Sequence, residues 1–140
     1  ADWQSTVAAF TKVKAEVGEI DVLVNNAGGS RDVLFRQMTQ DDWNAVMGSN
    51  LHALFNITKQ VIDGMSTRGW GRIVNIASVA GMRAVGSGRT AYGTSKGAVI
   101  ALTRQMAAEL AEYGVTANAV SPGPVDTPMT QVLHTALFRA

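Results

Sequence analysis

Tyr92 and Lys96 are the two residues whose types and spacing most clearly could do chemistry. They lie four positions apart in segment 91–97 (AYGTSKG), so a helix would place both side chains on one face, one turn apart. A free tyrosine has a pKa of ~10 and is a poor acid or base near neutral pH. A neighbouring ammonium group stabilises the phenolate. The pair is therefore a candidate proton donor to a carbonyl or acceptor from an alcohol, although such pairs also occur on solvated helix surfaces.

The elements that must position this pair alternate between helix and strand. Short β-branched runs predict strands at residues 20–25, 72–77 and 115–120, and residues 81–89 form a Gly-rich loop. Apolar spacing predicts helices that span about 7–17, 39–62 and 92–113, with a further short helix from about Pro128. Thr39 and Asp42 have the spacing of a capping box at the start of the second helix. This alternation predicts one α/β domain over residues 1–140, with a parallel sheet and helices on both of its faces.

Other polar residues fall where parallel strands end. Ser78 closes the second predicted strand, segment 25–28 (NNAG) closes the first, and segment 121–123 (SPG) follows the third. Ligands of open α/β sheets bind beyond the carboxyl ends of the strands. Asn50 is placed within a predicted helix, where asparagine is disfavoured. Each of these residues alone also fits a structural reading in a turn or cap, but together with Tyr92 and Lys96 they predict a site.

Composition excludes several classes of function. The chain has 140 residues, 46% hydrophobic and 16% charged, with a formal net charge of +1. Neither nucleic acid nor a membrane surface is therefore an expected partner. There is no cysteine, and His52 and His134 have no companions for a metal site. No apolar run reaches the ~20 residues of a membrane span and no signal peptide pattern is visible, so we expect a cytoplasmic protein.

Taken together, these motifs resemble those of the short-chain dehydrogenase/reductase family, in the family's order and over essentially the whole chain. They are Asn-Asn-Ala-Gly at 25–28, Asn50, Ser78, Tyr-x-x-x-Lys at 92–96 and Pro-Gly-x-x-x-Thr at 122–127. The resemblance implies a Rossmann-like, doubly wound parallel sheet. It also implies an NAD(P)-dependent oxidoreductase that interconverts a ketone and a secondary alcohol.

The resemblance further implies a role for each motif residue. Tyr92 would exchange a proton with the substrate oxygen while hydride passes to or from the nicotinamide, and Ser78 would hydrogen-bond the same oxygen. Lys96 would favour the phenolate of Tyr92 and hold the nicotinamide ribose. Asn50 would anchor a water that links Lys96 to solvent. The expected cofactor-binding residues are Asn25, Ala27, Gly28, Tyr92, Lys96, Pro122, Gly123, Val125 and Thr127.

Two family features have no match in the sequence. They are the Thr-Gly-x-x-x-Gly-x-Gly turn that approaches the pyrophosphate and the residue that selects NAD or NADP. We therefore expect an internal fragment that holds the central strands and helices, without the N-terminal phosphate-binding unit and the C-terminal strand. The cofactor is NADP or NAD, and the resemblance favours NADPH.

The substrate is indicated by residues 22–78, which are most similar to acetoacetyl-CoA reductases and 3-oxoacyl-ACP reductases. This similarity implies an acyl-CoA or acyl-ACP substrate and a parent homotetramer or dimer built on the helices around 50–66 and 92–112. Segments 79–90 and 124–129 depart from the reductase pattern. A dehydrogenase acting on a sugar, polyol or other secondary alcohol, a hybrid of two family members and a non-catalytic module of this fold therefore remain alternatives.

Overall fold

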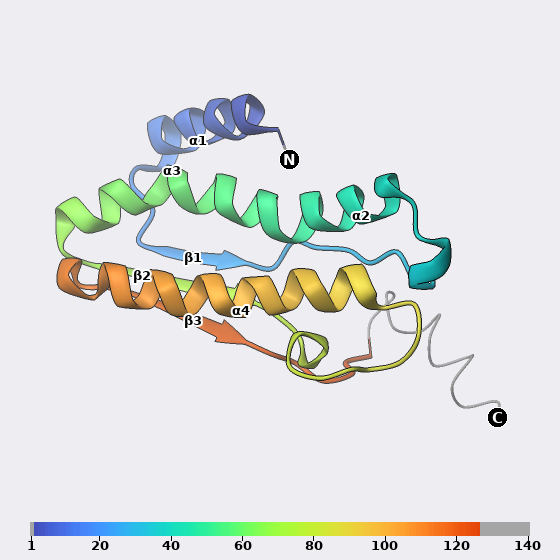
Figure 1. Cartoon of the computed structure of the whole chain (residues 1–140). Helices are drawn as coiled ribbons and strands as arrows, with labels where there is room; N and C mark the ends of the chain where they lie inside the picture. Colours follow the sequence, from blue (N-terminus) through green and yellow to red (C-terminus); the bar gives the residue numbers. More distant parts are fainter. Residues whose placement is uncertain (1, 127–140) are drawn as a thin grey trace.

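The computed structural model describes residues 2–126, which contain a sheet of three parallel strands (Figure 1). The strands are β1 (Val22–Asn25), β2 (Gly71–Ile76) and β3 (Val115–Val120). The α-helices are α1 (Trp3–Val17), α2 (Gln40–Met47), α3 (Ala53–Arg68) and α4 (Thr90–Leu110). Short helical turns are η1 (Phe35–Gln37), η2 (Gly48–His52), η3 (Val79–Gly81) and η4 (Ala111–Tyr113). The short helix predicted from Pro128 lies outside the described residues.

The sheet has the order β1-β2-β3, with both neighbouring pairs parallel. In its register, Asn25 lies opposite Asn75 and Ile76 lies opposite Val120, so the three carboxyl ends lie at one edge. This arrangement confirms the predicted Rossmann-like α/β class. The strand predicted from residue 20 begins two residues later, at Val22.

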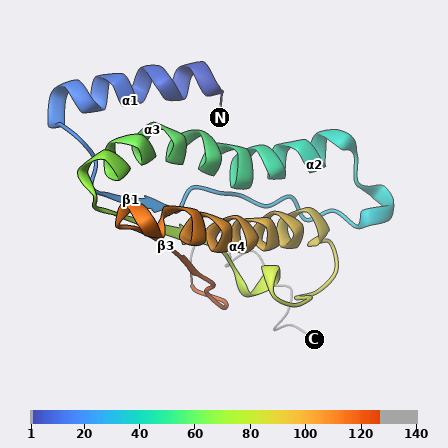
Figure 2. The same cartoon turned by 60° about the vertical axis from the view of Figure 1, so that its left-hand side comes forward.

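The helices of the described residues lie on one face of the sheet (Figures 1 and 2). Alternate strand residues face them and are buried, among them Ile73, Asn75 and Val115. Residues of the opposite parity, such as Val22, Val24 and Val120, are exposed. Helices on both faces, as the sequence predicts, are therefore not seen within residues 2–126. None of the described helices is long and apolar enough to cross a bilayer.

Local chemistry fixes the helix ends. The Asp2 carboxylate accepts a hydrogen bond from the Ser5 amide at 2.8 Å and caps α1, which ends at Gly18 with a φ of +89°. Thr39 and Asp42 form the predicted capping box of α2. The hydrogen bonds from Thr39 to the Asp42 carboxylate lower the pKa of that group. Stretch 39–62 is helical as predicted, but its turn η2 is a π-helix between α2 and α3.

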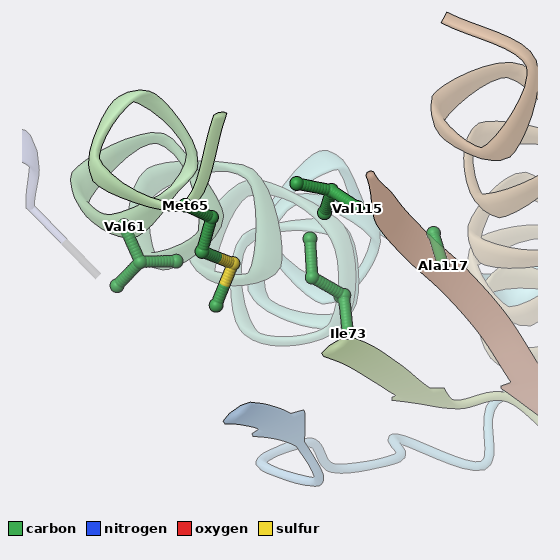
Figure 3. Packing of buried hydrophobic residues seen from close by; sticks show 5 residues of the cluster. All are labelled: Val61, Met65, Ile73, Val115 and Ala117. Atoms are coloured by element: carbon green, nitrogen blue, oxygen red, sulfur yellow. The ribbon is translucent and has the colours of Figure 1, made fainter. Parts of the chain in front are cut away.

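The main core lies between α3 and the amino-terminal half of the sheet. Figure 3 shows Val61 and Met65 of α3 close to Ile73, Val115 and Ala117 of the strands. A Cβ atom on Gly71 would lie 2.6 Å from the Met65 sulfur, so only glycine at position 71 lets Met65 pack against the start of β2. A second cluster of Leu54, Ala77 and Val99 lies further along the sheet. It anchors the end of β2 to α4, where the candidate site residues lie.

Candidate active site

Lys96 lies inside the protein, against the end of β2. Its ammonium nitrogen donates a hydrogen bond to the Ile76 carbonyl oxygen at 2.7 Å, and the residue is only 6% exposed. Burial lowers the pKa of Lys96 below its ordinary value of 10.5, since removal from water disfavours the charged form. The helical placement predicted for this residue is confirmed.

Tyr92 lies one turn before Lys96 on the first turns of α4. The Lys96 nitrogen is 5.8 Å from the centroid of the Tyr92 ring, so the two side chains share a face as the spacing predicts. A second cation, the guanidinium of Arg89, has its central carbon 5.6 Å from the same centroid. The tyrosine is thus flanked by two positive groups.

Ser78 follows β2 and begins η3. Its hydroxyl oxygen accepts a hydrogen bond from the Ala80 amide at 3.1 Å, and the residue is 9% exposed. The turn η3 lies directly on α4, because a Cβ atom on Gly81 would stand 2.6 Å from the Gly97 nitrogen. This close approach fixes Ser78 relative to the helix that carries Tyr92.

Asn50 holds three segments together from within the π-helical turn η2, where it is 2% exposed. Its Oδ1 accepts from the Gly29 amide at 2.7 Å and the Ser49 hydroxyl at 3.1 Å. Its Nδ2 donates to the Gly29 carbonyl and the Ser95 hydroxyl, both at 2.9 Å. An asparagine side chain has two donors and two acceptor sites. Gly29 and Ser95 occupy three of them, and the fourth faces the Ser49 hydroxyl, whose single proton is shared with the Val46 carbonyl oxygen at 3.2 Å.

Ser95 is a site residue that the sequence interpretation missed. Its hydroxyl donates to the Tyr92 carbonyl oxygen at 2.7 Å while it accepts from Asn50. Its position between Tyr92 and Lys96 was a signal that it faces inward. The signal is weak, because its partner Asn50 lies 45 residues away in the chain.

The segment after β1 comes close to both Asn50 and Lys96. A Cβ atom on Gly28 would lie 2.8 Å from the Asn50 Oδ1 and 3.6 Å from the Lys96 nitrogen. Only a residue without a side chain fits there without displacing Asn50. Ala27 and Gly28 themselves are exposed and form open surface at the carboxyl end of β1.

Asn25 lies below this surface and connects the layers. Its Nδ2 donates to the Asn75 Oδ1 at 2.8 Å and to the Thr58 hydroxyl at 3.0 Å. Asn75 in turn donates to the Thr103 hydroxyl at 2.9 Å. A buried polar chain thus runs from α3 through β1 and β2 to α4. Asn25 ties the sheet together and is 8% exposed.

The segment after β3 completes this edge. The Pro122 carbonyl oxygen accepts a hydrogen bond from the Val79 amide at 3.1 Å, which joins it to η3. Gly123 and Val125 are exposed. Thr127 lies outside the described residues. In residues 2–126, no group of three histidine, aspartate or glutamate side chains could hold a metal ion.

Known proteins are similar to this chain in sequence. The family model for short chain dehydrogenases matches residues 1–137, and the chain belongs to the short-chain dehydrogenase/reductase family. It is 57% identical over 134 residues to an acetoacetyl-CoA reductase of Cupriavidus necator, covering 96% of this chain and 54% of that protein. It is 41% identical over 133 residues to a 3-oxoacyl-[acyl-carrier-protein] reductase of Vibrio harveyi, covering 95% and 54%.

A solved structure is similar over the same region. The gluconate 5-dehydrogenase from Burkholderia cenocepacia J2315, in complex with NADP and tartrate, matches with a TM-score of 0.90 at 39% identity. The match covers 94% of this chain and 51% of that one. The chain therefore spans about half the length of the relatives it matches.

Proposed function

We propose that the complete protein is an NAD(P)-dependent oxidoreductase that interconverts a ketone and a secondary alcohol. Its preferred reaction is reduction of a 3-oxoacyl thioester of the acetoacetyl-CoA type. The observation that carries this proposal is the buried Lys96 beside Tyr92 on α4. The turn η3, which follows Ser78, packs closely against the same helix. The similarity to an acetoacetyl-CoA reductase at 57% identity supports the substrate class.

The residues at the carboxyl ends of β1 and β3 fit a nicotinamide cofactor. Gly28 packs closely on Asn50 near the Lys96 nitrogen, and the exposed surface of Ala27 and Gly28 is open to a ligand. In this proposal, the residues that hold the cofactor are Asn25, Ala27, Gly28, Tyr92, Lys96, Pro122, Gly123, Val125 and Thr127. The bound nicotinamide supplies or accepts the hydride. The NADP in the similar gluconate 5-dehydrogenase supports NADPH over NADH.

The proton is handled by the chain's own side chains. Tyr92 donates its hydroxyl proton to the substrate oxygen during reduction. The Ser78 hydroxyl accepts from the Ala80 amide, which leaves its own proton free to hydrogen-bond the same oxygen. Such a donor stabilises developing negative charge by a few kcal/mol. The Lys96 ammonium uses one donor on Ile76 and has two left for a ribose hydroxyl and a relay water.

Asn50 acts in this scheme through its backbone. Its side chain already contacts Gly29, Ser49 and Ser95, so we assign a water between Lys96 and solvent to the backbone carbonyl. A π-helical turn at this position supports that assignment, because such turns break the regular hydrogen-bond ladder. Asn50 thereby both clamps the loop after β1 and offers a relay site.

We also propose a domain organisation and an oligomeric state for the complete protein. Residues 1–140 form the central part of a single larger Rossmann-like domain, and the parent is a cytoplasmic homotetramer or dimer. The grooved surface between α3 and α4, which includes the half-exposed Phe55, supports self-association.

A second substrate class deserves a direct comparison. The similarity to a gluconate 5-dehydrogenase at 39% identity favours a sugar acid, sugar or polyol as the alternative. We expect kcat/KM of the full-length protein for acetoacetyl-CoA to exceed that for 5-ketogluconate by roughly a hundredfold. The reverse order would establish the second class. Absence of turnover with either ketone, and with NADPH or NADH, would support the non-catalytic alternative.

A further inference from the structure

An ion pair beside Tyr92 joins the loop after β1 to the start of α4. The Arg89 Nη2 lies 3.1 Å from the Asp32 Oδ2, and the Arg89 side chain is only 16% exposed. The central carbon of the same guanidinium is 5.6 Å from the Tyr92 ring centroid. The pair therefore lies beside the ring of Tyr92, at the border of the site in which a substrate of Tyr92 would bind.

Both partners are held by their backbones as well. The Val33 amide donates to the Gly88 carbonyl oxygen at 3.1 Å, next to the pair in both segments. The Gly93 amide donates to the Arg89 carbonyl oxygen at 2.7 Å, and Arg89 is the N-cap residue of α4. A guanidinium fixed in this way cannot leave Tyr92 without breaking an ion pair in which Arg89 is largely buried and Asp32 is 36% exposed.

The positive charge of Arg89 is compensated by the carboxylate of Asp32. Asp32 neutralises the guanidinium, so the pair presents no net charge to a substrate. The neighbouring Arg31 pairs with Asp42 at 3.2 Å and does not contribute to this pair. An unpaired guanidinium at the same place would attract a carboxylate, and an unpaired Asp32 would repel one.

We propose that the Asp32–Arg89 pair determines substrate specificity by favouring uncharged groups next to the ketone, such as an acyl thioester, over carboxylates. This inference rests on the proposed function, because it requires Tyr92 to act on the substrate carbonyl. It deepens that function by assigning the choice between thioester and carboxylate substrates to two residues.

Acetoacetate and its ethyl ester test the proposal, since they share the ketone and differ in one negative charge. The readout is the ratio of kcat/KM for acetoacetate to kcat/KM for ethyl acetoacetate, in the full-length protein. Asp32→Asn should raise this ratio about tenfold, and Arg89→Gln should lower it several-fold. The double variant should return close to the wild-type ratio. Asp63→Asn, on an exposed i,i+4 pair of α3, controls for net charge and should leave the ratio unchanged.

The ratio is insensitive to a general loss of activity, and either single variant alone tests the sign. The proposal is overturned if neither ratio moves, if both move in the same direction, or if Asp63→Asn moves the ratio as far as Asp32→Asn. If Asp32→Asn does not fold, an unchanged or raised ratio in Arg89→Gln still overturns it. Failure of the proposed function gives a different result, in which wild type reduces neither ketone.

Discussion

At the level of single residues, the ammonium group of Lys96 lies where burial disfavours charge. Its pKa is lowered in the folded protein, so the unfolded chain binds the proton more tightly. Below both pKa values the lysine is charged in both states and the full desolvation cost applies. As pH rises from the lowered pKa towards 10.5, the folded protein loses this proton before the unfolded chain does. The desolvation cost is then relieved, and the free energy of unfolding increases. Burial of the charged Lys96 therefore lowers the free energy of unfolding at neutral pH.

Lys96→Met tests this balance in the full-length apo protein. We expect the variant to lose reductase activity while its free energy of unfolding at neutral pH equals or exceeds that of wild type. The wild-type value should rise relative to the variant between neutral pH and about pH 10. Urea unfolding at several pH values measures this difference. Lys59→Met, which removes an exposed ammonium, is the control. If the free energy of unfolding of wild type minus that of Lys96→Met stays constant or falls as pH rises, burial of a charged Lys96 does not cost stability.

Spacing in the sequence was enough to predict that Tyr92 and Lys96 share a helix face. It was not enough for the partners that hold them. Asn50 meets Ser95 across 45 residues, and Arg89 meets Asp32 across a loop whose path no local pattern specifies. Long-range pairs of this kind depend on how the elements are packed, so they became visible only in the structure.

At the level of elements, the contact between η3 and α4 sets the position of Ser78 relative to Tyr92. A Cβ atom on Gly81 would lie 2.6 Å from backbone atoms of Lys96 and Gly97, which cannot move without shifting the helix. Gly93 has a similar role, since its Cβ would lie 2.9 Å from the Ala80 carbonyl oxygen. The two elements that carry the proposed catalytic groups thus touch through glycine.

Gly81→Ala should therefore separate η3 from α4. We expect a loss of roughly 1–3 kcal/mol in the free energy of unfolding and a fall in kcat of ten- to a hundredfold. Gly48→Ala is the matched control, because a Cβ there meets nothing within 4 Å and the residue has a helical φ of −60°. That variant should be neutral or slightly stabilising. Equal effects of the two substitutions on kcat would argue against a positioning role for Gly81.

Element types were largely predictable, because apolar period and cap residues are local signals. The capping box at Thr39 and Asp42 and the glycine that ends α1 are examples. The π-helical turn that contains Asn50 was not predicted, since its sequence continues an ordinary helical pattern. Asn50, an asparagine within a predicted helix, was the one local sign of this turn.

At the level of the whole molecule, one face of the sheet is not covered by any helix of residues 2–126 (Figure 2). Val22 and Val24 of β1 are 54% and 56% exposed there, and Val120 of β3 is 47% exposed. Parallel sheets are normally covered on both faces. The prediction of helices on both faces followed from the alternation of elements, which cannot say where a covering helix comes from.

The 140-residue polypeptide on its own should bind the dye ANS through this face. Val22→Thr/Val24→Thr keeps β-branched side chains in the strand and should lower the fluorescence markedly. Val17→Thr on α1, which is 73% exposed, is the control and should have little effect. A folded polypeptide without ANS fluorescence, or equal signals from all three proteins, would show that this face is not accessible.

The central claim is that Tyr92 transfers the proton in a hydride-transfer reaction. Its most direct test is the single-turnover rate of acetoacetyl-CoA reduction by full-length wild type and Tyr92→Phe, with cofactor affinity measured by nicotinamide fluorescence. We expect a rate at least about a thousandfold lower in the variant, with cofactor binding changed only a few-fold. A variant that binds cofactor normally and reacts within tenfold of wild type would contradict it.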